Sequence, residues 1–130
     1  MTAAMAALAA GLLGAALAAP AMAGGGDPQR GERVFQRCYA CHSVNPSKTN
    51  LPGPNLSGVI GRPAAALPGF RYSPAMRARG AAGLVWTEVQ LDRYLSDPEA
   101  MVPGTLMAVN GLPSAQERAD VIAYLKAARP

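Results

Sequence analysis

One pentapeptide, Cys38-Tyr39-Ala40-Cys41-His42, constrains this chain more than any other feature. Two thiols separated by two residues and followed directly by a histidine form the C-x-x-C-H pattern of covalent c-type haem attachment. In that chemistry the thiols add to the two vinyl groups of the porphyrin, and the imidazole of His42 is placed to ligate the iron. The chain has one histidine, which excludes a haem with two histidine ligands.

Three other interpretations of residues 38–42 are weaker. A C-x-x-C redox motif needs no histidine after it and favours a βαβ context. A structural zinc site needs four ligands, and this segment offers three. A disulfide across two intervening residues is strained. The pattern therefore predicts one covalently attached haem c.

The first 23 residues carry no charged side chain and consist mostly of alanine and leucine. Small residues at 21 and 23 form an A-x-A cleavage site, which predicts a signal peptide removed after Ala23 and an exported, periplasmic domain over residues 24–130. Attachment of haem to such a motif takes place outside the bacterial cytoplasm, which agrees with export. The alternative is a retained membrane anchor, because the apolar run is just long enough to span a bilayer.

The formal charge of +4 comes from twelve basic and eight acidic residues, all of them beyond position 26. A mild positive balance of this kind favours solubility or electrostatic steering towards an acidic partner. The basic residues are scattered and form no dense run, which argues against nucleic-acid binding.

Helix signals recur along the chain, and no alternating run indicates a sheet. Residues 43–72 contain five prolines, which predicts long loops there. Caps and first-turn prolines predict a helix from Asp27 and a short one over 73–80. Capping boxes predict helices from Thr87 and from Ser114, with Asp97-Pro98 ending the former. We therefore expect an all-α single domain with about three main helices and long loops wrapped around one covalently attached haem.

Three methionines beyond residue 23, Met76, Met101 and Met107, could supply a second axial ligand to the iron. A thioether is a soft ligand that favours the ferrous state. Met107 follows a short loop that contains Pro103 and Gly104, whereas the other two methionines lie within or beside helical segments. Spacing alone leaves the choice open.

The chain from Gly26 to Lys126 resembles class I cytochrome c, of the mitochondrial type and its soluble bacterial relatives. The resemblance is carried by the C-x-x-C-H motif, by Gly53-Pro54-Asn55-Leu56, by Gly61-Arg62, by Pro103-Gly104-Thr105-Leu106-Met107 and by Ala123-Tyr124-Leu125-Lys126. It implies thioether bonds through Cys38 and Cys41 and axial ligation by His42 and Met107.

The same resemblance implies further roles around the haem. The Pro54 carbonyl is expected to accept a hydrogen bond from His42, which orients the ligand. Arg62 is expected to face a haem propionate, Tyr72 and Trp86 to hydrogen-bond the propionates, Tyr94 to bring its hydroxyl near the axial sulfur, and Thr105 to lie in the axial methionine loop.

The resemblance implies a monomeric, exported one-electron carrier and not an enzyme. Its donor would be a quinol-oxidising cytochrome complex, and its acceptor an oxidase, a peroxidase or a photosynthetic reaction centre. Membranes would be reached only through these complexes unless residues 1–23 are retained. Two alternatives are a haem subunit of a periplasmic dehydrogenase and a ligand-binding or peroxidase-like haem protein.

The chain departs from the family at the expected haem edge, where mitochondrial members carry a ring of lysines. The corresponding positions here include Glu99, Ala100 and Leu106, and Val109 stands where an aromatic residue is common. The interaction face is therefore expected to be less basic and more apolar than in those members.

Overall fold

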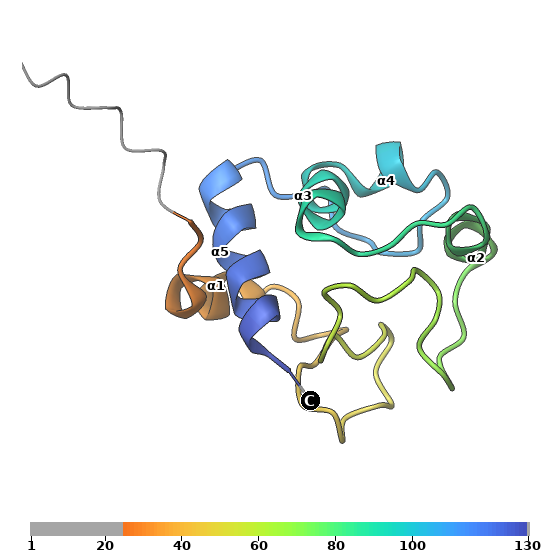
Figure 1. Ribbon diagram of the computed structural model, residues 1–130, viewed down its shortest axis with the longest axis horizontal. Helices are drawn as coiled ribbons and strands as arrows, with labels where there is room; N and C mark the ends of the chain where they lie inside the picture. The colour runs from red at the N-terminus through yellow and green to blue at the C-terminus, as the bar shows by residue number, and fades with distance from the viewer. Residues whose placement is uncertain (1–24, 130) are drawn as a thin grey trace, which may run out of the picture.

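The computed structural model describes residues 25–129, which form five helices joined by long loops (Figure 1). The helices are α1 Pro28–Phe35, α2 Pro74–Ala81, α3 Glu88–Ser96, α4 Pro98–Met101 and α5 Ala115–Ala127. Within the described residues the only extended pairing is an isolated bridge between Pro63 and Val85. The expected all-α fold is confirmed, with α1, α3 and α5 as its main helices.

The capping residues start the helices where the sequence predicts. Asp27 accepts a hydrogen bond from the Arg30 amide at 2.8 Å, which satisfies a donor that the first turn of α1 would leave free. Ser73, Thr87 and Ser114 make the equivalent bonds at the starts of α2, α3 and α5. The separate helix α4 was not predicted, although its signals are visible: Pro98 takes its first position, and Asp97 caps it.

Helix α1 ends before the C-x-x-C-H motif begins. It ends at Phe35, and the chain then tightens into a turn in which the Cys38 amide donates to the Phe35 carbonyl at 2.7 Å. Such i to i−3 bonds commonly close a helix. The C-x-x-C-H motif therefore lies in a hydrogen-bonded turn that continues directly from α1.

Helices α1 and α5 cross in close contact at one end of the molecule (Figure 1). A Cβ atom at Gly31 would collide with the backbone carbonyl of Asp120, so only glycine permits this approach. Beside the crossing, the rings of Phe35 and Tyr124 pack with centroids 5.3 Å apart. The cost of a glycine inside α1 is thus offset by packing between the two helices.

Asp120 is a buried carboxylate that joins α5 to the start of α1. It is 3% exposed and accepts hydrogen bonds from the Asp27 amide at 2.8 Å and from Arg30 Nε at 2.8 Å. The Gln116 amide donates to it at 2.9 Å. A second link is made by Arg37, just beyond α1, which donates two hydrogen bonds to Glu117 of α5.

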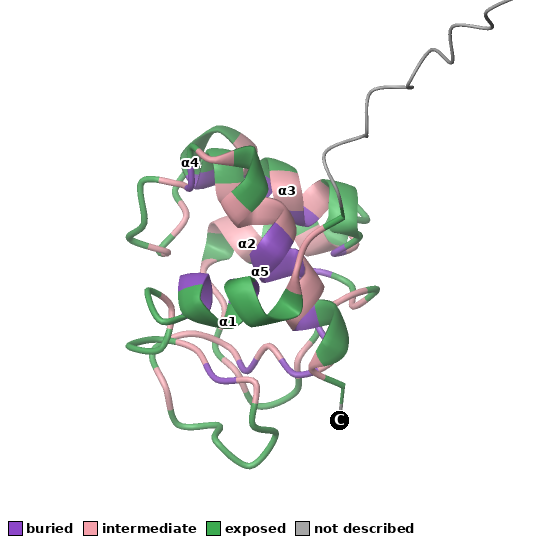
Figure 2. Ribbon diagram, turned by 90° about the vertical axis from the view of Figure 1, so that its left-hand side faces the viewer, coloured by how far each residue is buried: buried purple, intermediate pink, exposed green. Residues whose placement is uncertain are grey.

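The buried core lies along α5 and α3 and extends into the loops (Figure 2). Phe35, Val102 and Val121 are its largest fully buried side chains. Arg118 of α5 holds the neighbouring segments in place, since it donates to Asp92 of α3 at 2.7 Å and to the Leu112 carbonyl at 2.7 Å. None of the helices within residues 25–129 combines the length and apolarity that a bilayer span requires.

We expect Asp120→Asn to lower the free energy of unfolding by about 2 kcal/mol, because it weakens the charge-assisted hydrogen bonds of a buried carboxylate. Denaturant unfolding of the haem-loaded protein measures this change. Asp92→Asn is the matched control: Asp92 is 46% exposed in its pair with Arg118, and such pairs contribute less than about 1 kcal/mol. Equal losses in the two variants would contradict the prediction.

The contribution of Asp120 should also depend on pH. The hydrogen bond from Arg30 holds the pKa of the Asp120 carboxyl well below its ordinary value of 3.8, against the opposing effect of burial. Since the folded pKa is the lower one, the stabilisation is complete above pH 3.8 and is lost as the pH falls from 3.8 towards the folded value. The difference between wild type and Asp120→Asn should therefore shrink in that acidic range.

Candidate haem site

The turn after α1 places two free thiols and one imidazole side by side. Cys38 is partly buried and Cys41 is exposed. The His42 amide donates to the Cys38 carbonyl at 2.8 Å, which closes the turn. Burial is the main effect that raises the pKa of the Cys38 thiol. The side chains of Cys38, Cys41 and His42 thus come from one short, hydrogen-bonded turn.

His42 is oriented by the carbonyl of Pro54. Its Nδ1 lies 2.7 Å from that oxygen, and because a carbonyl can only accept, Nδ1 carries the hydrogen. The lone pair of the neutral ring is then on Nε2. Burial lowers the pKa of His42, and the Pro54 bond opposes that shift in part. The predicted contact is present, and it prepares Nε2 to bind a metal.

Gly53 is a residue of this site to which sequence reasoning assigned no role. A Cβ atom here would lie 2.5 Å from His42 Cε1 and 2.8 Å from the Cys41 carbonyl oxygen. The Gly53 amide donates to that same carbonyl at 2.8 Å. The backbone at 53 therefore packs directly on the imidazole. The only signal in the sequence is a glycine flanked by two prolines.

Asn55 organises the loop that carries Pro54. Its buried amide donates to the carbonyls of Asn45 and Lys48 at 2.6 and 3.0 Å, and its side-chain oxygen accepts from the Ser57 amide at 2.8 Å. Arg62, expected at a propionate, donates to the carbonyls of Asn55 and Ser57 at 2.9 and 2.6 Å. Arg62 thus supports the loop, and its contact with a propionate remains a prediction.

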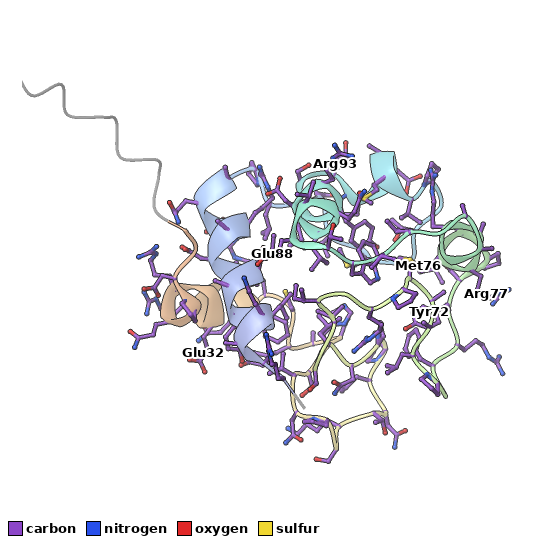
Figure 3. All side chains as sticks on the ribbon, in the orientation of Figure 1. Glu32, Tyr72, Met76, Arg77, Glu88 and Arg93 are labelled. Carbon is purple, nitrogen blue, oxygen red and sulfur yellow. The ribbon has the colours of Figure 1, made fainter. Side chains whose placement is uncertain are left out.

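The three aromatic residues that were expected near the haem belong to two separate aromatic pairs. Trp86 is buried against Tyr94, with ring centroids 5.1 Å apart. Tyr72 packs edge-on against Phe70, and its hydroxyl accepts a hydrogen bond from the Leu67 amide at 3.3 Å. Figure 3 shows Tyr72 close to α2. The propionate contacts of Tyr72 and Trp86 remain predictions.

The Met107 loop is tied to α3 through Thr105. The Tyr94 hydroxyl lies 2.7 Å from Thr105 Oγ1, and the same oxygen accepts a hydrogen bond from the Met107 amide at 3.3 Å. At the start of the loop Gly104 has a φ of 82°, which favours glycine, and its amide donates to Glu99 at 2.9 Å. These bonds define the backbone path that presents Met107.

All three candidate methionines are partly buried against the core. Met76 belongs to α2 and Met101 to the end of α4, where a methionine commonly fills space between helices. Met107 lies in a loop whose preceding residues Gly104 and Thr105 are hydrogen-bonded to Glu99 of α4 and Tyr94 of α3. The described geometry therefore singles out Met107 by its support, while the choice of sulfur ligand remains a prediction.

The residues present fit a covalently held haem. Two free thiols lie in one turn with a neutral imidazole whose Nε2 is available, and the absence of a side chain at Gly53 makes room for that ring. Partly buried apolar side chains also pack around the core near these elements: Cys38, Leu56, Ile60, Leu84 and Met107. Such an arrangement suits a large apolar group tethered at one edge.

Comparison with known proteins agrees with this arrangement. The sequence model of the family described as Cytochrome c matches residues 28–129. Cytochrome c2 of Rhodomicrobium vannielii is 48% identical over 115 residues, which cover 88% of this chain and 90% of that protein.

Solved structures show the same likeness. Cytochrome c2 from Rhodospirillum centenum superposes with a TM-score of 0.75 at 46% identity and covers 81% of this chain and 100% of its own. Cytochrome cH from Methylobacterium extorquens superposes with a TM-score of 0.71 at 38% identity and covers 78% and 99%. The chain belongs to the cytochrome c family, whose members carry covalently attached haem c and transfer electrons rather than catalyse a reaction.

Proposed function

We propose that this protein is an exported monohaem carrier of single electrons, with His42 and Met107 as the two axial ligands of the iron. The observation that supports this most directly is the 2.7 Å hydrogen bond between His42 Nδ1 and the Pro54 carbonyl. It fixes the tautomer with the hydrogen on Nδ1 and the lone pair on Nε2, while burial lowers the pKa of His42 and so favours the neutral ring. A ligand prepared in this way on a C-x-x-C-H turn suits a haem iron.

Cys38 and Cys41 would hold the haem through thioether bonds. When bound, haem c supplies an iron that cycles between the ferrous and ferric states. With His42 and Met107 as ligands, no site would remain open for a substrate, and a redox change would need little change in geometry. The chain's own part is to fix both ligands, to exclude water from the core and to expose one edge to partners.

Thr105 steadies the methionine side of this ligand set. It accepts from the Met107 amide at 3.3 Å and pairs with the Tyr94 hydroxyl at 2.7 Å. Burial raises the pKa of Tyr94, against the effect of the Thr105 bond, so the phenol keeps its proton at neutral pH. The loop is thereby attached to α3, which belongs to the packed core.

We place the carrier in the periplasm, released by cleavage after Ala23, although residues 1–24 lie outside the described part of the chain. Its donor is a quinol-oxidising cytochrome complex, and its acceptor an oxidase, a peroxidase or a reaction centre. A carrier must dissociate quickly, so its contacts should be small.

A second candidate function is a haem subunit bound stably to a periplasmic dehydrogenase. It is favoured by the exposed apolar side chains of Leu106 and Val109, which are 79% and 43% exposed beside Met107. Co-purification with a larger enzyme would favour this candidate, whereas a monomer on gel filtration favours the carrier.

Met107→Ala should abolish the weak long-wavelength sulfur-to-iron absorption band of the oxidised protein, because no thioether then reaches the iron. Absorption spectra of wild type and variant test this directly. Met76→Ala and Met101→Ala are matched controls that should keep the band. Survival of the band in Met107→Ala, with its loss in either control, would assign the ligand to another methionine.

Thr105→Val should let Met107 dissociate more readily, since it preserves shape but removes the acceptor of the Met107 amide and the partner of Tyr94. We expect carbon monoxide to bind the ferrous variant roughly tenfold faster, a change of about 1.4 kcal/mol that two lost hydrogen bonds can supply. Stopped-flow mixing measures the rate. Thr105→Ser retains the hydroxyl and should behave like wild type; similar acceleration in the serine variant would rule out the hydrogen bond as the cause.

Gly53→Ala should destabilise the haem-loaded protein by about 1–3 kcal/mol, the usual range for overpacking a tight site. The added methyl group would push His42 or the Cys41 carbonyl out of place. Denaturant unfolding measures the loss. Gly25→Ala, which meets no atom within 4 Å, is the control and should unfold like wild type. An unaffected Gly53→Ala protein would show that the loop adjusts freely.

A further inference from the structure

Asn110 differs from the other asparagines of the chain by the residue that follows it. The sequence contains Asn45, Asn50, Asn55 and Asn110, and only Asn110 is followed by a glycine. The backbone nitrogen after an asparagine can attack the carbon of the side-chain amide, and a glycine there has no side chain to hinder the attack. The pair Asn110-Gly111 is therefore where the sequence most favours conversion of an asparagine to an acid.

The structure requires the glycine at position 111. Gly111 has a φ of 89°, in the left-handed region that favours glycine. A Cβ atom added to it would also collide with the backbone carbonyl of Ser96, the last residue of α3. Packing of the loop against the end of α3 thus fixes the one residue type that leaves the nitrogen of position 111 open to its neighbour.

Both reacting groups are accessible. Asn110 is exposed, and within residues 25–129 the Gly111 amide makes no backbone hydrogen bond. Two of the other asparagines are held in ways that prevent the reaction. Asn55 is buried, and its side chain makes three hydrogen bonds. Asn45 precedes Pro46, whose nitrogen carries no hydrogen to lose.

The short segment that contains Asn110 joins α4 to α5 and is fixed to α3 at both ends (Figure 1). Before it, Thr105 Oγ1 lies 2.7 Å from a tyrosine hydroxyl of α3. After it, the amide of buried Leu112 donates to the Leu95 carbonyl of α3 at 2.7 Å. Met107 lies between these two attachments. A change in the length of the main chain here must therefore be accommodated in the stretch that presents Met107.

We propose that Asn110 is a site of spontaneous deamidation that alters the Met107 loop as the protein ages. The Gly111 nitrogen loses its proton and bonds to the side-chain carbon of Asn110, ammonia leaves, and a cyclic succinimide forms. Water then opens this ring at one of its two carbonyls and gives aspartate or isoaspartate, without any oxidant or reductant.

The two products differ in their effect on the loop. Both add a negative charge, but isoaspartate also adds one carbon atom to the main chain between the two attachments to α3. Isoaspartate should therefore displace Met107, whereas aspartate changes only the charge. The effect on Met107 rests on the proposed ligand set, while the deamidation itself does not depend on it.

The first test follows the charge of the haem-loaded protein during incubation in mildly alkaline buffer, which helps the attacking nitrogen to lose its proton. Ion-exchange chromatography should show the wild type losing one unit of its formal +4 charge, and peptide mapping should place the new acid at residue 110. Asn110→Gln should keep its charge, because the longer side chain closes such a ring far more slowly. Asn50→Gln is the matched control at another exposed asparagine, followed by leucine, and should convert like wild type. An unchanged wild-type charge, or an acid mapped to Asn50, would overturn the proposal.

The second test measures carbon monoxide binding to the ferrous protein. The fraction that contains isoaspartate should bind roughly tenfold faster than fresh wild type, as Thr105→Val does, because the displaced loop loses the same hydrogen bonds at Thr105. Asn110→Asp carries the charge of the product on a normal main chain and should bind at the wild-type rate. Equal rates for the isoaspartate fraction and wild type would overturn the effect on Met107. Absence of the sulfur-to-iron band from fresh wild type would instead count against the proposed ligand set, whatever happens at Asn110.

Discussion

The close crossing of α1 and α5 is the contact on which the rest of the structure depends. The backbones meet at Gly31, and buried Asp120 ties them together by accepting bonds from Asp27 and Arg30. The motif turn continues directly from the end of α1, so its thiols take their position from this crossing. A site made mostly of loops is thereby built out from a rigid pair of helices at one end of the molecule.

Local signals predicted most of the fold. Helix starts can be predicted because a capping side chain binds the amide of a residue only three positions further on. This holds for Asp27, Ser73, Thr87 and Ser114. The site was harder to predict from the sequence, since its contacts join segments that lie far apart along the chain. The bond from His42 to Pro54 was expected only through family resemblance, and the packing of Gly53 on the imidazole was not expected. Backbone approaches of this kind leave almost no trace in a sequence.

The charged residues are distributed unevenly around the loop that carries Met107. A methionine loop with exposed Leu106 lacks the lysines expected at this edge in mitochondrial relatives, yet α2 beside it carries unpaired arginines within the described chain. With Leu106 and Val109 exposed, the expected interaction face would be more apolar than a ring of lysines.

The acceptor that orients His42 is a main-chain oxygen, and this has an evolutionary consequence. Every amino acid at position 54 would offer a carbonyl, so no single substitution there removes the acceptor atom itself. Mutational sensitivity is instead transferred to the neighbours that shape the loop, Gly53 by its lack of a side chain and Asn55 by its three hydrogen bonds. The orientation of the His42 imidazole thus depends on the path of the backbone more than on any one side chain.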